Sequence, residues 1–138
     1  NPHYMRLQKE NRALYERELY AYFQGDTPAL CTWNLQNNLF DLADKYEEYF
    51  NDTAKAAALN REILSITEKS RRAFGRDPFL PEILYAGLRA CVYLRDWQEV
   101  KKRCEEIMGN YPDYRMMWAI EDFYKDSLEN LSGKEGDK

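Results

Sequence analysis

The chain has 138 residues, of which 44% are hydrophobic and 32% charged, a composition that is ordinary for one globular domain. Its formal net charge is −4, with both signs mixed along the chain, so we do not expect it to bind nucleic acid. No stretch of about 18 apolar residues occurs, so we expect no membrane-spanning helix.

The cysteines point to a reducing environment. Cys31, Cys91 and Cys104 are odd in number and widely spaced, and no CxxC pair occurs. This pattern does not suit a disulfide framework and favours a cytoplasmic location. Because the sequence begins with Asn1 and not with Met, we expect the chain to be part of a longer protein.

The first half of the chain predicts three long helices, over residues 3–24, 28–50 and 53–75. Apolar residues recur there three, four and seven positions apart, which is the spacing of one face of an α-helix. Gly25 ends the first run, and Asn51-Asp52-Thr53 supplies three candidate caps for the third helix. The three apolar faces comprise Tyr15, Leu19, Tyr22 and Phe23; then Leu35, Leu39, Leu42, Tyr46, Tyr49 and Phe50; then Ala56, Leu59, Ile63, Ile66, Ala73 and Phe74.

The second half predicts three further helices, over residues 81–94, 96–108 and 113–131. A linker with two prolines precedes them, and Pro78 and Pro81 prevent a helix from running through it. The first two of these helices are short and are joined by a tight connection.

The predicted fold is all-α, because no segment shows the alternating pattern of a β-strand. We expect one helical domain over residues 1–131, followed by a small, charged and disordered tail over residues 132–138. Gly109 is expected to end the fifth helix in a left-handed conformation.

The most specific pattern lies between Leu84 and Trp118. It reads Leu84-x2-Gly87-Leu88-x2-Cys91, then Val100-x3-Cys104, then Pro112. This resembles the tetratricopeptide repeat, whose pattern is W-x2-L-G-x2-Y, then A-x3-F, then proline. The resemblance covers one repeat, about residues 81–114. The half-TPR family of RNA-processing factors shares the proline-to-tryptophan spacing and stays an alternative.

The resemblance has clear departures. Glycine and leucine are exchanged in order, and cysteines stand where the family has aromatic residues. Trp118 falls where a next repeat would place its tryptophan, but Glu121 and Asp122 follow where leucine and glycine belong. We therefore expect a capping helix after the single repeat.

The resemblance implies antiparallel helical hairpins stacked as a short array of about six helices. In such arrays the first helix of each hairpin lines a groove that binds a peptide or a partner helix. By this analogy the partner-binding residues would be Tyr85, Arg89, Val92, Tyr93 and Phe123. Gly87 would allow a close helix approach, while Cys91 and Cys104 would face each other as small hydrophobic residues.

Nothing in the chain suggests catalysis. Its one histidine is His3, and it contains no P-loop, GxGxxG, GxSxG, HExxH or CxxC motif. We expect a protein that is not an enzyme and that uses no cofactor or metal. Its expected function is a scaffold-like module that binds a protein or peptide.

A regulatory or dimerisation domain of a multidomain regulator, such as a bacterial transcription regulator, is the alternative function. The helix over residues 28–50 would then form the seam of a homodimer. The competing interpretation is that this seam packs inside the monomer. The seam residues are Leu35, Leu39, Leu42, Tyr46 and Tyr49.

Overall fold

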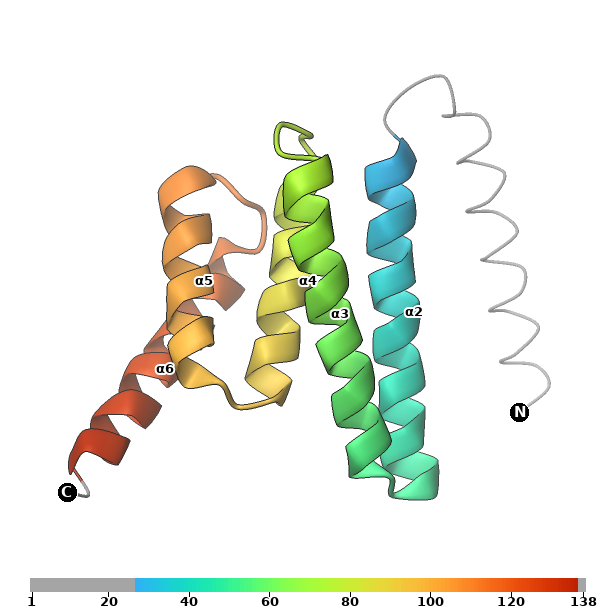
Figure 1. Cartoon of the computed structure of the whole chain (residues 1–138). Coiled ribbons are helices and arrows are strands. Elements are labelled where there is room, and N and C mark those ends of the chain that lie inside the picture. Colours follow the sequence, from blue (N-terminus) through green and yellow to red (C-terminus); the bar gives the residue numbers. More distant parts are fainter. Residues whose placement is uncertain (1–26, 137–138) are drawn as a thin grey trace.

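The computed structural model describes residues 27–136, where all regular structure is helical (Figure 1). The all-α prediction is confirmed for these residues, and the helix predicted over residues 3–24 lies outside them. No described helix is both long and apolar enough to cross a membrane. The five described helices are α2 (Thr27–Phe50), α3 (Thr53–Ala73), α4 (Leu80–Tyr93), α5 (Trp97–Asn110) and α6 (Met117–Gly136).

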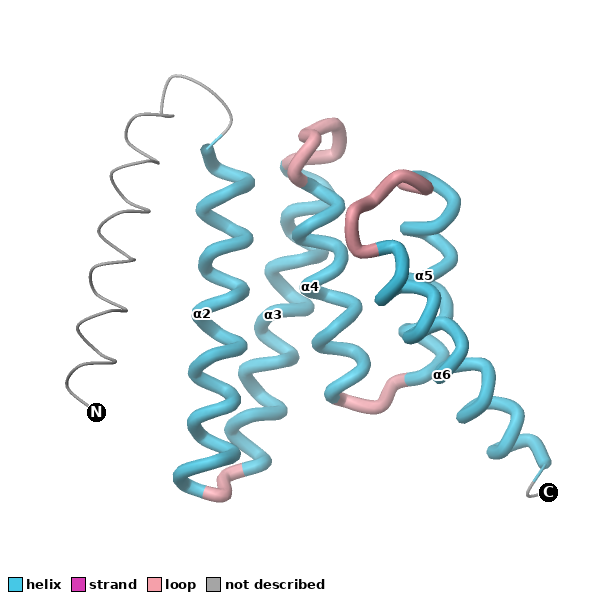
Figure 2. The backbone as a smooth tube through the Cα atoms, turned by 180° about the vertical axis from the view of Figure 1, so that it is seen from behind, coloured by secondary structure: helices cyan, strands magenta, loops and turns pink. Residues whose placement is uncertain are grey.

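Consecutive helices run in alternating directions, and each packs against the next. In the view of Figure 1, α3 lies in front of α4 and α5 lies in front of α6. Figure 2, seen from behind, brings α6 to the front. α3 and α5 lie on one side of the molecule, and α4 and α6 lie on the other. Because α2 contacts α4 as well as α3, the second side carries side chains from α2, α4 and α6.

Aspartates begin two of the helices. The carboxylate of Asp52 accepts a hydrogen bond from the backbone N–H of Lys55 at 3.0 Å. The carboxylate of Asp96 accepts one from Glu99 at 3.4 Å. Each bond satisfies a backbone donor that has no partner within its helix, so Asp52 is the residue that caps α3.

Left-handed residues follow the ends of α2 and α4, and neither is a glycine. Asn51 has φ of 50° and Arg95 has φ of 57°. After Arg95, the N–H of Asp96 donates to the carbonyl of Cys91 at 3.1 Å, a bond typical of a helix that ends in this conformation. Asparagine tolerates this geometry, whereas for arginine it is strained.

The prediction that Gly109 is a left-handed cap is wrong. α5 continues through Gly109 to Asn110, and no described glycine has a positive φ. The helix ends at Tyr111, whose N–H donates to the carbonyl of Ile107 at 2.8 Å. The carbonyl of Ile107 thus finds a partner without a left-handed glycine.

α6 ends later than the sequence predicts. It runs to Gly136, so residues 132–136 are helical and not part of a disordered tail. The apolar spacing on which the prediction depended stops at Leu131. Once a helix has formed, however, each further residue adds a backbone hydrogen bond without any need for an apolar face.

Cys91 and Cys104 are buried in the main core, as the hydrophobic interpretation expects. Burial raises the pKa of the Cys91 thiol to about 11 and that of Cys104 to about 12. Both thiols are therefore protonated at neutral pH and act as small apolar side chains. The same core cluster contains Ala29, Leu80, Ile83, Leu84, Leu88, Val100, Ile107 and Ile120.

A buried junction joins α2, α3 and α4. The fully buried Gln36 donates from Nε2 to Oγ1 of Thr67 at 2.9 Å, and the same nitrogen lies 3.4 Å from the carbonyl oxygen of Ile83. Opposite Thr67 lies Gly87, where an added Cβ would be only 2.7 Å from both Oγ1 and Cγ2 of the threonine. Gly87 therefore allows another helix to pack closely against α4, as predicted. The helix that packs there is α3.

Replacing Gly87 by alanine should destabilise the protein. The added methyl group meets the Thr67 side chain below normal contact distance, and overpacking of this kind costs about 1–3 kcal/mol. Urea denaturation followed by circular dichroism measures the change in the free energy of unfolding.

Gly109→Ala is the matched control. A Cβ at Gly109 meets no atom within 4 Å, and alanine is favoured over glycine inside a helix by up to about 1 kcal/mol. If Gly87→Ala were as stable as this control, the junction would be looser than the structure shows.

Candidate partner-binding surface

Arg89 is an exposed residue of α4 that lies over an aromatic ring of α2. Its guanidinium carbon is 4.4 Å from the ring centroid of Phe40 and 5.9 Å from that of Tyr85. Ala86 and Ala90 are buried on the other face of the same turns, which leaves Tyr85 and Arg89 together on the outer face because they are four residues apart. Among the described residues Arg89 has no salt-bridge partner, so its N–H groups remain available to another molecule.

Tyr85 continues this aromatic surface towards α6. Its ring centroid is 5.8 Å from that of Tyr114 and 6.4 Å from that of Phe123 in α6. Burial raises the pKa of Tyr85, so its hydroxyl is neutral and can donate a hydrogen bond. Phe40, Arg89, Tyr85 and Phe123 therefore form a row that crosses α2, α4 and α6. We call this row the aromatic–arginine surface.

Glu82 holds the segment before α6 against α4. Its carboxylate accepts a hydrogen bond from the hydroxyl of Tyr114 at 3.0 Å, and from Nε and Nη2 of Arg115 at 2.6 and 2.9 Å. Burial, followed by the negative charge of Glu82, raises the pKa of Tyr114 well above its usual range. These bonds position α6 so that Phe123 meets Tyr85.

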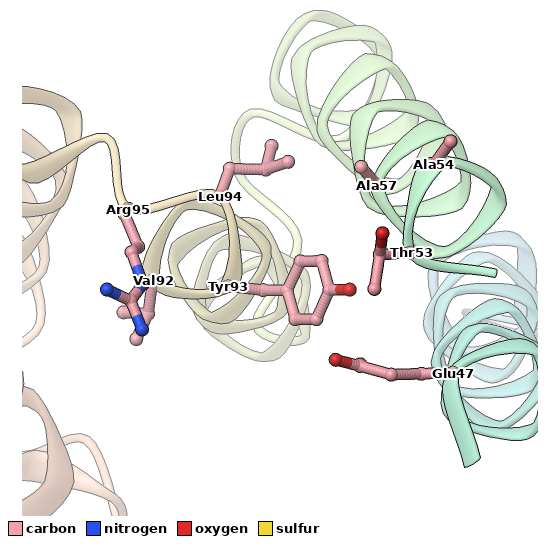
Figure 3. A pocket seen from close by; sticks show the side chains of 8 residues that line it. All are labelled: Glu47, Thr53, Ala54, Ala57, Val92, Tyr93, Leu94 and Arg95. Atoms are coloured by element: carbon pink, nitrogen blue, oxygen red, sulfur yellow. The ribbon is translucent and has the colours of Figure 1, made fainter. Parts of the chain in front are cut away.

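Val92 and Tyr93, the other two predicted partner-binding residues, lie about one turn beyond Arg89, at the C-terminal end of α4. They line a hollow of about 680 Å³ near the C-terminal end of α4 (Figure 3). Tyr93 points towards α2 and α3, with the carboxylate of Glu47 beside its hydroxyl. The hollow is lined by Glu47, Thr53, Ala54, Ala57, Val92, Tyr93, Leu94 and Arg95.

The α2 side of this hollow is acidic. Burial raises the pKa of the Asp44 carboxyl, and repulsion from Asp41 and Glu48 raises it further, while Arg89 opposes the change. Burial also raises the pKa of the Tyr93 hydroxyl, and so does Glu47. Among the residues that line the hollow, Glu47 is the acid and Arg95 is the base.

The opposite side of the molecule carries a network of ion pairs between α3 and α5. Glu68 accepts from Nη2 of Arg103 at 2.7 Å and from Nε of Arg71 at 3.2 Å. Arg71 also pairs with Glu106, and Nε of Arg103 lies 3.3 Å from Glu99. Because these arginines have acidic partners within the fold, they join helices and are poor candidates for binding an anionic ligand.

The sequence interpretation missed Phe40 and Glu47. Phe40 falls outside the apolar stripe assigned to its helix, and Glu47 is one of several acids near the end of that helix. Only the contact between α2 and α4 shows that these two residues lie beside Arg89 and Tyr93. Within the described part of the chain, no group of three or more His, Cys, Asp and Glu residues is placed to hold a metal ion.

Comparison with models of known protein families, with curated proteins and with solved structures finds no significant match to this chain. The resemblance to tetratricopeptide repeats therefore stays a prediction. Trp118, which that resemblance places at the start of a next repeat, is 64% exposed. No described helix covers it.

Glu68→Gln should lower stability in a pH-dependent way. Burial acts to raise the pKa of Glu68, but the hydrogen bond and charge of Arg103, together with Arg71, lower it below its ordinary value of 4.5. A lowered carboxyl pKa stabilises the fold above about pH 4.5, and this contribution disappears as the pH falls through the folded-state pKa. Since the side chain is 45% exposed, screening limits the loss at pH 7 to about 1 kcal/mol.

Urea denaturation at pH 7 and at pH 3 measures this effect. Glu62→Gln, which changes an exposed acid of the same helix, is the control. Equal stabilities of the two variants at pH 7, or a difference that grew on acidification, would contradict the assigned role of Glu68.

Proposed function

We propose that this chain is a non-catalytic protein–protein interaction module that binds a peptide or a partner helix on the face formed by α2, α4 and α6. The observation that carries this proposal is the exposed guanidinium of Arg89, stacked on Phe40 and next to Tyr85. Arginine and tyrosine are among the residues that dominate the binding energy of protein interfaces. The resemblance to tetratricopeptide repeats favours the same face.

The geometry of Arg89 suits recognition by several contacts at once. Its stacked guanidinium is held by an aromatic face, which lowers the conformational entropy that a free arginine side chain would lose on binding. The rings of Tyr85 and Phe123 lie beside it and offer apolar contact area, and the tyrosine adds a hydroxyl. The proposed binding residues on this row are Tyr85, Arg89 and Phe123, with Val92 and Tyr93 at the neighbouring hollow.

The double substitution Tyr85→Ala with Arg89→Glu should weaken partner binding at least about tenfold, which corresponds to about 1.4 kcal/mol. The partner is first identified by affinity capture and mass spectrometry, and then purified. Isothermal titration calorimetry with the purified partner measures the change in affinity.

Lys102→Glu, which changes an exposed residue of α5 away from the proposed face, is the control and should bind normally. A double variant that keeps its circular dichroism spectrum and binds as tightly as this control would disprove the proposed face.

A second candidate function is dimerisation, as in a regulatory domain of a multidomain regulator. The structure divides the predicted seam, since Leu39 and Tyr46 pack against the cluster of Ala43, Ala56 and Leu59. The other seam residues stay uncovered and lie seven residues apart, the spacing of a coiled-coil contact. They are Leu35, Leu42 and Tyr49, exposed by 48, 43 and 74%.

If dimerisation is the function, light scattering at high protein concentration should give the mass of two chains. Leu42→Glu should restore the mass of one chain without changing the circular dichroism spectrum, because Leu42 is exposed in the single chain. Glu129→Gln on the exposed surface of α6 is the control. The mass of one chain for the unchanged protein at all concentrations would exclude this candidate.

A further inference from the structure

One side of α2 carries an apolar stripe that no described helix covers. Its members are Leu35, Leu42 and Tyr49, which are 48, 43 and 74% exposed. They recur every seven residues and so lie on one side of the helix. Phe40 and Ala43, on another side of α2, pack against residues of α3 and α4. The exposed stripe is therefore a second contact surface of α2, of the kind that receives a further helix.

Polar residues flank this stripe along one edge. Asn34, Asp41 and Glu48 each come one position before a residue of the stripe. Asp41 and Glu48 are exposed and form no salt bridge with another described residue. Nδ2 of Asn34 is buried and has no hydrogen-bond partner among the described residues. A buried donor without an acceptor is costly, so we expect the occupant of this stripe to bring polar as well as apolar groups.

The part of the chain before α2 has the length and the position to cover the stripe. The helix predicted over residues 3–24 would be about 33 Å long, and α2, with 24 residues, is about 36 Å long. Only residues 25 and 26 separate the predicted helix from Thr27, where α2 begins. A connection this short joins antiparallel neighbours, so the two helices would lie side by side along their length.

The same part of the chain matches the stripe in chemistry. It contains the apolar face predicted from the helical spacing, which comprises Tyr15, Leu19, Tyr22 and Phe23. Residues 3–12 contain three lysines or arginines and one acid, whereas the last ten residues of α2 contain four acids and one lysine. In an antiparallel pair, residues equally far from the connection lie side by side. The basic end of the predicted helix therefore meets the acidic end of α2, and this complementarity favours the pairing.

We propose that residues 3–24 form a helix that packs antiparallel on Leu35, Leu42 and Tyr49 of the same chain, with its basic end beside Asp41 and Glu48. The inference goes beyond the proposed function, because the stripe lies on a different side of α2 from the aromatic–arginine surface. A second copy of the chain competes poorly for the stripe, since a tethered segment has an effective concentration of the order of millimolar. The stripe is thus closed within one chain, while the aromatic–arginine surface stays open to a partner.

Hydrogen exchange of the full chain at low concentration, followed by mass spectrometry, tests this proposal. The amides of residues 3–24 should be protected, because helices in proteins are stabilised chiefly by the packing of an apolar face. Leu42→Glu places a charge in the stripe and should speed exchange of these amides at least about tenfold. Leu128→Glu is the matched control and should leave their exchange unchanged, since Leu128 in α6 is 42% exposed and Leu42 is 43% exposed.

A charge exchange locates the contact. Asp41 and Arg12 lie almost equally far from the connection between the two helices. Asp41→Lys should speed exchange of residues 3–24, because it places a cation beside the basic end of the segment, and Arg12→Glu alone should do the same. The two substitutions together should restore protection, as expected for residues that interact directly.

Fast exchange of residues 3–24 in the unchanged chain would overturn the inference, and so would equal exchange in Leu42→Glu and Leu128→Glu. Protection that increases with protein concentration would assign the stripe to a second copy and would also overturn it. Circular dichroism establishes that each variant folds. These outcomes are independent of the Tyr85 and Arg89 test, which measures affinity for the purified partner.

Discussion

The structure depends on the close approach of α3 and α4 at Gly87. A side chain there would collide with Thr67, so glycine sets how near the two helices lie. Thr67 in turn accepts the amide of Gln36, a fully buried residue of α2. A buried amide is costly unless it is hydrogen-bonded, so this bond favours one position of α2 relative to the other two helices. One small residue and one buried polar contact thus determine how three helices meet.

The binding surface is a consequence of that junction. With α2 held against α4, Phe40 lies under the guanidinium of Arg89, and Glu47 lies beside the hydroxyl of Tyr93. Neither pair is adjacent in sequence, and neither forms unless α2 and α4 are in contact. At the other edge of α4, Glu82 performs a similar task through Tyr114 and Arg115, because it brings α6 close enough for Phe123 to meet Tyr85.

The two sides of the molecule divide structural and binding roles. Arg71 and Arg103 are each paired with a glutamate across the contact between α3 and α5. Cys91 and Cys104 lie in the apolar core, with thiol pKa values of about 11 and 12. Across α2, α4 and α6 the situation is reversed. Arg89 lacks a salt-bridge partner among the described residues, and the acids of α2 repel one another. Charges left uncompensated by the fold are the ones that a partner can use.

The sequence by itself determined the all-α class and the approximate limits of the described helices, and it offered Asp52 as one of three candidate caps and Gly87 as a residue that allows a close helix approach. These properties depend on local spacing and on the intrinsic geometry of single residues, which a linear pattern records. The tertiary structure alone decided that Gly87 faces Thr67. It also decided that Tyr85, Arg89 and Phe123 meet, and that Val92 and Tyr93 line a hollow. Finally, it left three apolar residues of α2 exposed, namely Leu35, Leu42 and Tyr49. Those outcomes depend on which face of each helix meets which neighbour, and helical periodicity identifies an apolar face without identifying the helix that covers it.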